Sequence, residues 1–251
     1  MDRQATTIAA KLLIDARRSG NLLDRLPEAS RPRNAAEAYA IQLETVAEMG
    51  DAVAGWKVAI SAQYDFLIGL LVRSRVFESG AAIPAARMAM LGVEAEIAFR
   101  FDHALPPRER AYERNEVEAA VTALPAIEIV DSRYRDYHGT AVIDRAADFM
   151  SNGAFVAGVA LDTWRSLDLA NLRVCLTIDG VDIVQHIGGN VAGDPFNLAI
   201  ALANRLRLLN GVRAGQILTT GTYTGLQLAK SNSLVIVTFE GFDPVTCQFL
   251  A

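Results

Sequence analysis

The sequence of 251 residues has few cysteines and histidines, the side chains that most often build nucleophilic or soft-metal sites. Cys175 and Cys247 both lie in apolar, strand-like segments, which indicates buried thiols in a reducing compartment rather than a disulfide framework. His103, His138 and His186 stand in unrelated contexts, with no serine or cysteine elbow motif beside them. We therefore expect neither a zinc site nor a nucleophile–histidine site. Of the three histidines, only His138 lies in a loop that is placed to close over a pocket.

Long apolar runs and a one-sided charge are also missing. No segment approaches the ~20 apolar residues of a membrane-spanning helix, and no basic-then-apolar leader opens the sequence. The formal net charge of -5 and the interleaving of acidic with basic residues argue against a nucleic-acid partner. No glycine-rich loop follows a strand, so a nucleotide site is not predicted either. These absences predict a cytoplasmic protein without a membrane or nucleic-acid partner.

The first fifth of the sequence has a helical pattern. Residues 4–19 carry an apolar stripe and end at Gly20, and residues 34–50 begin with Asn34 and Glu37, which are spaced as in a capping box. The stripe of the first helix consists of Ile8, Leu12, Leu13 and Ala16. We expect residues 1–50 to form a helical N-terminal region that packs on a main domain of residues 51–251.

From residue 51 the pattern changes to short β-branched runs that are separated by turns. Two helices are expected to interrupt them, one over residues 115–124 and one from Asp194, as N-cap, to Gly211. Asp179 and Gly180 predict a hairpin. The expected strands fall within residues 53–60, 92–101, 125–134, 153–161, 171–186, 215–221 and 233–242. Together these patterns predict an α+β fold with a curved, mixed but mostly antiparallel sheet and flanking helices.

Three glutamates stand in segments that otherwise look buried. In "MLGVEAEIAFRF", residues 90–101, Glu94 and Glu96 share one face of an apolar strand, because residues i and i+2 of a strand point the same way. Glu128 lies between two isoleucines in another apolar strand. Three separate buried carboxylates would be costly, whereas three that converge on one divalent cation would not. A ligand set of oxygens alone favours a hard ion such as Mg²⁺, Mn²⁺ or Ca²⁺.

Each of these features has a plainer alternative. A Glu-x-Glu pair also occurs on the solvent face of an antiparallel sheet, and Glu128 has Arg133 and Arg135 as potential ion-pair partners. Lys57, in "GWKVAI", either extends to the surface or lies desolvated near the carboxylates, where it can move protons. The stretch 219–226, "TTGTYTGL", either holds a carboxylate or enolate oxygen or is an ordinary tight turn.

Taken together, these segments resemble the fumarylacetoacetate hydrolase superfamily and, within it, the branch of 2-keto-4-pentenoate hydratases and 4-oxalocrotonate decarboxylases. Seven segments occur in the order of that family, nearly end to end: "EAYAIQ", "GWKVAIS", "GVEAEIAFRF", "PAIEIVDSRY", "ADFMSNGAFVAG", "GDPFNLAIALAN" and "AGQILTTGTYTG". The Glu-x-Glu, the later glutamate and the Gly-Thr-x-x-Gly loop are its more specific parts. The resemblance implies the β-roll of the fumarylacetoacetate hydrolase type and a homo-oligomer.

The resemblance also implies a site. It assigns Mg²⁺ or Mn²⁺ to Glu94, Glu96 and Glu128, proton transfer to Lys57, and the substrate carboxylate to the threonine-rich loop with Gly221 and Thr222. A second substrate carboxylate would need a basic partner, for which Arg133, Arg73 and Arg75 are the candidates. The implied activity is that of a lyase, a metal-dependent hydratase that adds water to a 2-hydroxy-2,4-dienoate in the catabolism of aromatic compounds.

Two alternatives remain open at this point: a 4-oxalocrotonate decarboxylase and a catalytically degenerate binding or activating subunit. Two departures from the family pattern motivate the second, and a third, at Arg73 and Arg75, points to a different substrate. The family often has "ADN" where this sequence has Ala147, Asp148 and Phe149, and often "PGD" where residues 230–233 stand. After the lysine strand it tends to carry a proline and an acidic residue where this sequence has Arg73 and Arg75. Hydrolysis ranks lower, because no early His–Glu pair is present to activate water.

Overall fold

A computed structural model of the chain describes residues 1–59, 64, 66–86 and 88–251. Its α-helices are α1 (Arg3–Ser19), α2 (Ala35–Met49), α3 (Arg114–Ala120), α4 (Val142–Ala147) and α5 (Phe196–Leu206). Its first seven strands are β1 (Val53–Ala59), β2 (Leu67–Val72), β3 (Val76–Glu78), β4 (Ala81–Pro84), β5 (Gly92–Phe101), β6 (Val121–Val130) and β7 (Asn152–Ala157). The others are β8 (Arg173–Ile178), β9 (Val181–Ile187), β10 (Ile217–Thr222), β11 (Gln227–Leu228), β12 (Leu234–Phe239) and β13 (Val245–Leu250).

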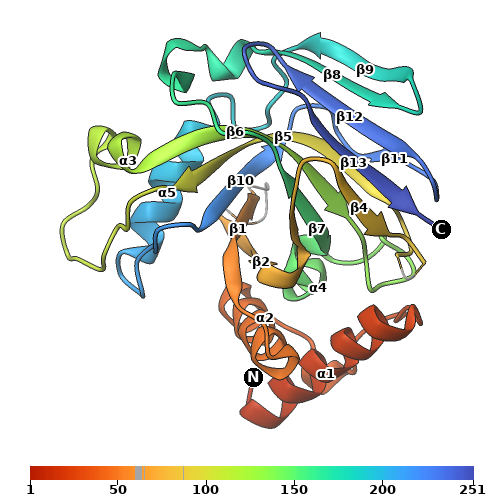
Figure 1. Cartoon of the computed structure of the whole chain (residues 1–251). Helices are drawn as coiled ribbons and strands as arrows, with labels where there is room; N and C mark the ends of the chain where they lie inside the picture. Colours follow the sequence, from red (N-terminus) through yellow and green to blue (C-terminus); the bar gives the residue numbers. More distant parts are fainter. Residues whose placement is uncertain (60–63, 65, 87) are drawn as a thin grey trace.

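The strands form two curved sheets that lie against each other, with the helices at their margins (Figure 1). The larger sheet has the order β2-β1-β10-β5-β6-β7-β3, with β11 paired to β5, and the smaller sheet has the order β4-β13-β12-β8-β9. Among the described residues, neighbouring strands are antiparallel except in the pairs β1–β10, β3–β7 and β4–β13. The expected α+β fold with a mixed, mostly antiparallel sheet is confirmed, although the strands divide between two sheets.

The N-terminal helices follow their sequence signals closely. The carboxylate of Asp2 caps α1, and Gly20 ends it in the left-handed conformation. The side chain of Asn34 accepts a hydrogen bond from the Glu37 N–H at the start of α2, as an N-cap does. The predicted apolar stripe of α1 is wrong at Ile8, which is 41% exposed. Small residues such as Ala9 take the buried face instead, because α1 and α2 pack closely.

Three predictions in the rest of the chain need correction. Residues 121–124 do not continue a helix from residue 115, because they begin β6 and pair with the end of β5. The strand predicted over 125–134 therefore starts earlier and ends at Val130. The helix predicted from Asp194 to Gly211 begins at Phe196 and ends at Leu206, although the Asp194 carboxylate still accepts the Phe196 N–H.

Other predictions hold. Asp179 and Gly180 make the turn between β8 and β9, both with positive φ as that hairpin type requires. The expected strands did not include β2, β3, β4, β11 and β13. The last residue of the strand predicted over 53–60 lies outside the described residues.

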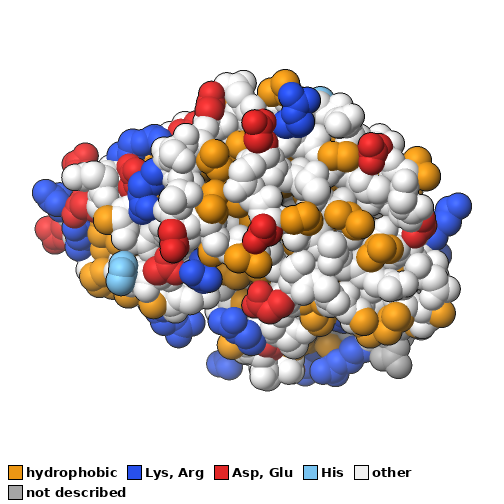
Figure 2. Space-filling model, turned by 45° about the horizontal axis from the view of Figure 1, so that its top comes forward, with side chains coloured by type: hydrophobic (Ala, Val, Ile, Leu, Met, Phe, Trp, Pro, Cys, Tyr) orange, Lys and Arg blue, Asp and Glu red, His pale blue; other side chains and the backbone are white. Residues whose placement is uncertain are grey.

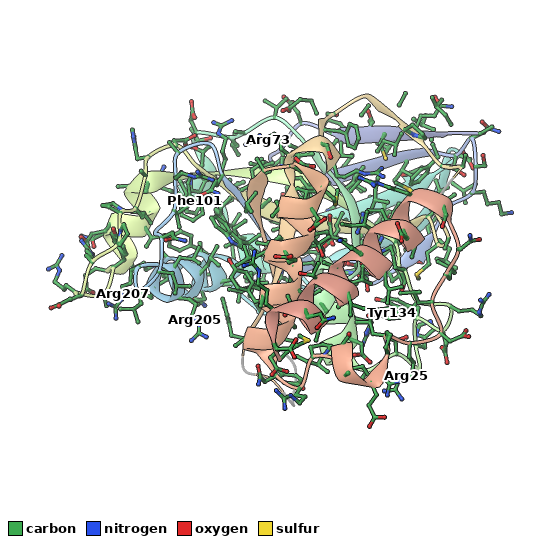
Figure 3. The ribbon with its side chains drawn as sticks, turned by 90° about the horizontal axis from the view of Figure 1, so that it is seen from below. Arg25, Arg73, Phe101, Tyr134, Arg205 and Arg207 are labelled. Carbon is green, nitrogen blue, oxygen red and sulfur yellow. The ribbon has the colours of Figure 1, made fainter. Side chains whose placement is uncertain are left out.

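The helices α1 and α2 lie across one end of the molecule, where Figure 3 shows Tyr134 beneath them and Arg73 beside the C-terminal end of α2. Gln42 of α2 is fully buried and fixes this arrangement. Its Nε2 donates to the carbonyls of Ile68 and Ala146, 2.8 and 2.7 Å away, while its Oε1 accepts the Leu70 N–H at 2.8 Å. Because a buried amide with such partners resists displacement, α2 holds β2 and α4 in a fixed position.

On the face in Figure 2, basic and acidic side chains are interspersed with apolar ones. Within the described part of the chain, none of the helices combines the length and the hydrophobicity that a bilayer crossing requires.

Candidate functional site

The three glutamates singled out in the sequence come together. Glu94 on β5 lies directly opposite Glu128 on β6, and Glu96 follows on the same face of β5. One carboxylate oxygen from each residue lies within 4.8 Å of the other two. Glu96 and Glu128 are completely buried. The Glu-x-Glu pair of β5 therefore does not lie on a solvent face of the sheet.

The hydrogen bonds of the two buried glutamates leave one oxygen of each free. Glu96 Oε2 accepts from the Thr219 hydroxyl and from the Gly221 N–H, the latter at 3.0 Å. Glu128 Oε1 accepts from Lys57 Nζ at 2.6 Å and from Asn152 Nδ2 at 3.0 Å. Glu96 Oε1 and Glu128 Oε2 are buried and have no partner among the described residues. Buried oxygens of this kind are costly unless something positive satisfies them, so the residues fit a divalent cation.

The electrostatics of the cluster also fit a cation. Burial raises the pKa of Glu94 to about 7, against the opposing effect of Lys57 and with the help of Glu128. Burial, and then the charges of Glu128 and Glu94, hold the pKa of Glu96 well above its usual value. In the absence of a cation the cluster therefore retains protons near neutral pH, and a divalent ion would replace them.

Lys57 reaches the cluster from β1 because that strand lies unusually close to β10. A Cβ atom on Gly55 would lie 1.9 Å from the Ile217 carbonyl oxygen, so this approach requires glycine. The two strands pair in parallel, which places Lys57 beside Thr219. Burial alone would lower the pKa of Lys57, but the charges of Glu128, Glu94 and Glu96 together raise it above its usual value. Lys57 is thus an ammonium group within the site, and the surface alternative does not apply.

The threonine-rich loop contributes through a bulge. The register between β10 and β5 shifts between Thr219 and Thr222, and Gly221 lies there with a φ of +88°. This bulge turns the Gly221 N–H away from the ladder and toward the Glu96 carboxylate. Gly221 and Thr222 both line the cavity in front of the glutamates.

That cavity has a volume of about 260 Å³. Its polar lining consists of Lys57, Glu94, Glu96, Tyr137, Arg145, Ser151 and Thr222, and its apolar lining includes Val58, Leu67, Val142, Met150 and Val191. Sequence reasoning missed Tyr137, Arg145, Ser151 and Asn152. The loop around His138, which we expected near a pocket, borders the cavity through Tyr137. His138 itself is exposed. Nothing in its local sequence distinguishes Arg145 from any other helical arginine.

Arg133 is not among these lining residues. Its guanidinium is 1% exposed and donates from Nε to Asp148, at 2.6 Å to Oδ1, and from Nη1 to Asp131 at 3.3 Å. Arg73 is exposed, and Arg75 lines a different cavity together with Arg17 and Asp131. The structure therefore brings none of the three arginines proposed for a second substrate carboxylate to the glutamate site.

The other departures from the family pattern also have structural explanations. Phe149, Met150 and Ser151 all have φ between +52° and +61°, a conformation that asparagine adopts more easily than phenylalanine. Phe149 compensates by burial and by its contact with Arg17, whose guanidinium carbon lies 5.3 Å from the ring centre. The turn at residues 230–233 holds the β8–β9 hairpin, since the Ser233 hydroxyl donates to Asp179 at 2.8 Å. Neither Phe149 nor residues 230–233 line the cavity in front of the glutamates.

The buried pair of Arg133 and Asp148 supports the segment that leads from α4 into β7, and it carries a stability prediction. We expect Asp148→Ala to lower the free energy of unfolding by about 3–5 kcal/mol, because it leaves a buried guanidinium unpaired. Burial raises the pKa of Asp148, while the positive charges of Arg133 and Arg17 act to lower it. The two guanidinium groups keep their charge and therefore still need the carboxylate as a counterion.

Urea denaturation measures this effect, and Asp24→Ala is the matched control. Asp24 pairs with Arg135 at 2.9 Å, but the two side chains are 86% and 67% exposed. We expect the control to change the free energy of unfolding by less than about 1 kcal/mol. Equal effects of the two substitutions would contradict the supporting role of the buried pair.

Fold and site together define a class: a two-sheet α+β protein whose paired strands bring three carboxylates together beside a largely buried lysine, an arrangement that fits a divalent cation. No family model matches the chain. The chain is 31% identical to a 2-keto-4-pentenoate hydratase of Paraburkholderia phymatum over 262 residues, which covers 99% of this chain and 98% of the relative. The fold matches 4-oxalocrotonate decarboxylase from Pseudomonas putida G7, complexed with magnesium and adipate, with a TM-score of 0.87, 21% identity and coverage of 100% and 99%.

A fumarylacetoacetate hydrolase from Exiguobacterium antarcticum shares the fold more distantly, with a TM-score of 0.61 and 14% identity over 80% of this chain and 76% of that one. The chain therefore belongs to the family of the 2-keto-4-pentenoate hydratases, and it shares its fold with a 4-oxalocrotonate decarboxylase and a fumarylacetoacetate hydrolase. Hydratases of this family are lyases.

Proposed function

We propose that this protein is a divalent-metal-dependent hydratase that adds water to a 2-hydroxy-2,4-dienoate in the breakdown of aromatic compounds. One observation carries the proposal: two completely buried glutamates each have one hydrogen-bonded oxygen and one free oxygen, beside a third glutamate and an open cavity. The hydratase named above, which this chain matches along nearly its whole length, supports the choice of substrate.

In this proposal, Glu94, Glu96 and Glu128 hold Mg²⁺ or Mn²⁺, since hard ions prefer carboxylate oxygens. The bound cation supplies a Lewis acid for a 2-oxo acid. The hydrogen bonds from Thr219 and Gly221 to Glu96, and from Asn152 to Glu128, fix the orientation of two of the three carboxylates. The apolar side chains of Val58, Leu67 and Val191 also line the cavity.

Lys57 is the group placed to move protons. Because its pKa is raised, it begins the reaction as an ammonium and can donate a proton from Nζ to C5 of the dienol. The dienol gives up its 2-hydroxyl proton to the neutral Lys57 amine that this leaves and becomes a conjugated 2-oxo-3-enoate. A water molecule then adds across C3 and C4, with its hydroxyl group on C4 and its proton on C3. Gly221 and Thr222, on the wall next to Glu96, are the groups we assign to the substrate carboxylate.

A turnover assay tests the proposal. Purified protein with Mg²⁺ or Mn²⁺ is supplied with 2-hydroxypenta-2,4-dienoate or 2-oxohex-3-enedioate, and dienol absorbance and released CO₂ are followed. We expect loss of dienol absorbance without CO₂ from the first compound. CO₂ release from the second alone would instead favour the decarboxylase, for which Arg145 in the cavity is the specific argument. Tight metal binding without turnover of either compound would contradict both and favour a binding subunit.

We further propose a homo-oligomer in the cytoplasm. Val181, Ile183 and Ile187 are exposed on β9, the edge strand of the smaller sheet, and such edges are commonly covered by another chain. Two free cysteines fit a reducing compartment. Light scattering on the purified protein tests the assembly, and a monomeric mass at micromolar concentration would contradict it.

A further inference from the structure

Arg145 is a half-buried cation in the cavity wall whose side chain has no anionic partner among the described residues. Its Nε is buried without a hydrogen-bond acceptor, and among the described residues its guanidinium forms neither a hydrogen bond nor an ion pair. Its guanidinium carbon lies over the ring of Tyr137, 5.0 Å from the ring centre. A buried guanidinium donor that lines a cavity and lacks an acceptor is suited to a ligand oxygen.

The position of Arg145 is fixed by its neighbours along the chain. The carbonyl of Ala146 accepts the hydrogen bond of the buried Gln42, and Asp148 is held by Arg133. The stacking of the guanidinium on Tyr137 restricts its rotation, since cation–π contacts favour one face. A cation held in this way is preorganised for its ligand and loses little entropy when it binds.

The other charges of the site do not require Arg145. The three glutamates are balanced by Lys57 together with one divalent cation, and no described contact joins Arg145 to any of the three. Arg145 belongs instead to the wall that α4 and the preceding loop provide, together with Tyr137 and Val142. The site therefore holds one positive charge beyond those that the carboxylates balance.

We propose that Arg145 binds a second, distal carboxylate of the substrate, so that the cavity favours 2-oxo dicarboxylic acids over 2-oxo monocarboxylic acids of equal length. This inference rests on the proposed function in taking the glutamate cluster as the place where the 2-oxo acid end binds. The apolar side chains of Val142 and Met150 then face the carbon chain that joins the two acidic ends. Arg145 is in this sense a specificity-determining residue.

Calorimetry with two unreactive ligands tests the inference without turnover. The Mg²⁺-loaded protein is titrated with 2-oxoadipate and with 2-oxohexanoate, which have the same length and differ by the distal carboxylate. We expect 2-oxoadipate to bind about tenfold or more tightly than 2-oxohexanoate, as a charge-assisted, two-pronged hydrogen bond would provide. Arg145→Met should reduce this preference to about one, and Arg145→Lys should retain part of it.

Arg135→Met is the matched control, because it removes an exposed arginine that pairs with Asp24 outside the cavity. It should leave the preference unchanged, and circular dichroism of each variant confirms folding. If Arg145→Met weakened the binding of both ligands equally, Arg145 would lie at the proximal carboxylate and the inference would be overturned. Equal affinities of the parent protein for the two ligands would also overturn it. If Mg²⁺ binds but neither ligand does, the proposed function itself fails, which is a result distinct from the other two.

Discussion

Glu128→Gln is expected to weaken Mg²⁺ or Mn²⁺ binding by more than about a hundredfold and to abolish turnover. Glu128 is completely buried, and its Oε2 has no partner among the described residues, so an amide there removes both the charge and the free oxygen. Groups that merely support metal ligands already account for about 10–100-fold in affinity. Isothermal calorimetry with the metal alone measures the effect.

The same experiment on Glu96→Gln separates a metal role from a structural one. Burial holds the pKa of Glu96 well above its usual value, which means that folding disfavours its charged form. The cation-free Glu96→Gln protein should therefore unfold at the same temperature as the parent or higher, while metal no longer raises that temperature. Glu240→Gln, a change at an exposed glutamate in the turn after β12, is the control and should alter neither quantity. Parent-like metal affinity in either site variant would refute the assignment.

The glutamate cluster could be predicted because its signal is local. Two carboxylates two residues apart on an apolar strand must share a face, and a third in an equally apolar strand has the same difficulty. The identity of their partners is not local. Lys57 and Glu128 are 71 positions apart, and their contact depends on the pairing of β1 with β10, which depends in turn on Gly55. For the same reason, the sequence left Arg133 as a candidate for substrate binding, whereas the structure pairs it with Asp148.

The fold likewise combines features that a local sequence signal predicts with features that depend on contacts between distant residues. The N-terminal helices could be placed because their caps lie within the sequence of the helix itself. The end of α3 could not, because residues 121–124 extend as a strand by pairing with β5 and not through any preference visible in "VTAL". The role of Arg145 was hidden for a related reason, since only the packing of α4 on α2 brings it to the cavity.

Lys57→Met is expected to reduce kcat by about a thousandfold and to leave metal affinity within a few-fold of the parent. Proton transfer by a positioned side chain accounts for about 10²–10⁴ in rate, and Lys57 is the one ammonium group in contact with the glutamates among the described residues. Loss of its charge leaves Glu128 without its closest cation, but a divalent ion would compensate for this. Stopped-flow measurement of dienol consumption, with calorimetry for the metal, separates the two effects.

Binding of the unreactive 2-oxoadipate distinguishes loss of chemistry from loss of the site. If Lys57 moves protons, Lys57→Met should still bind this ligand with Mg²⁺ within about threefold of the parent, because the chelating groups remain. Lys230→Met, at an exposed lysine, controls for the loss of one positive charge. Turnover by Lys57→Met within threefold of the parent would remove Lys57 from the chemistry. A parent-like kcat with a raised KM and a matching loss of 2-oxoadipate binding would make it a positioning residue, because an interaction made equally in the ground state and the transition state affects binding and not the chemical step.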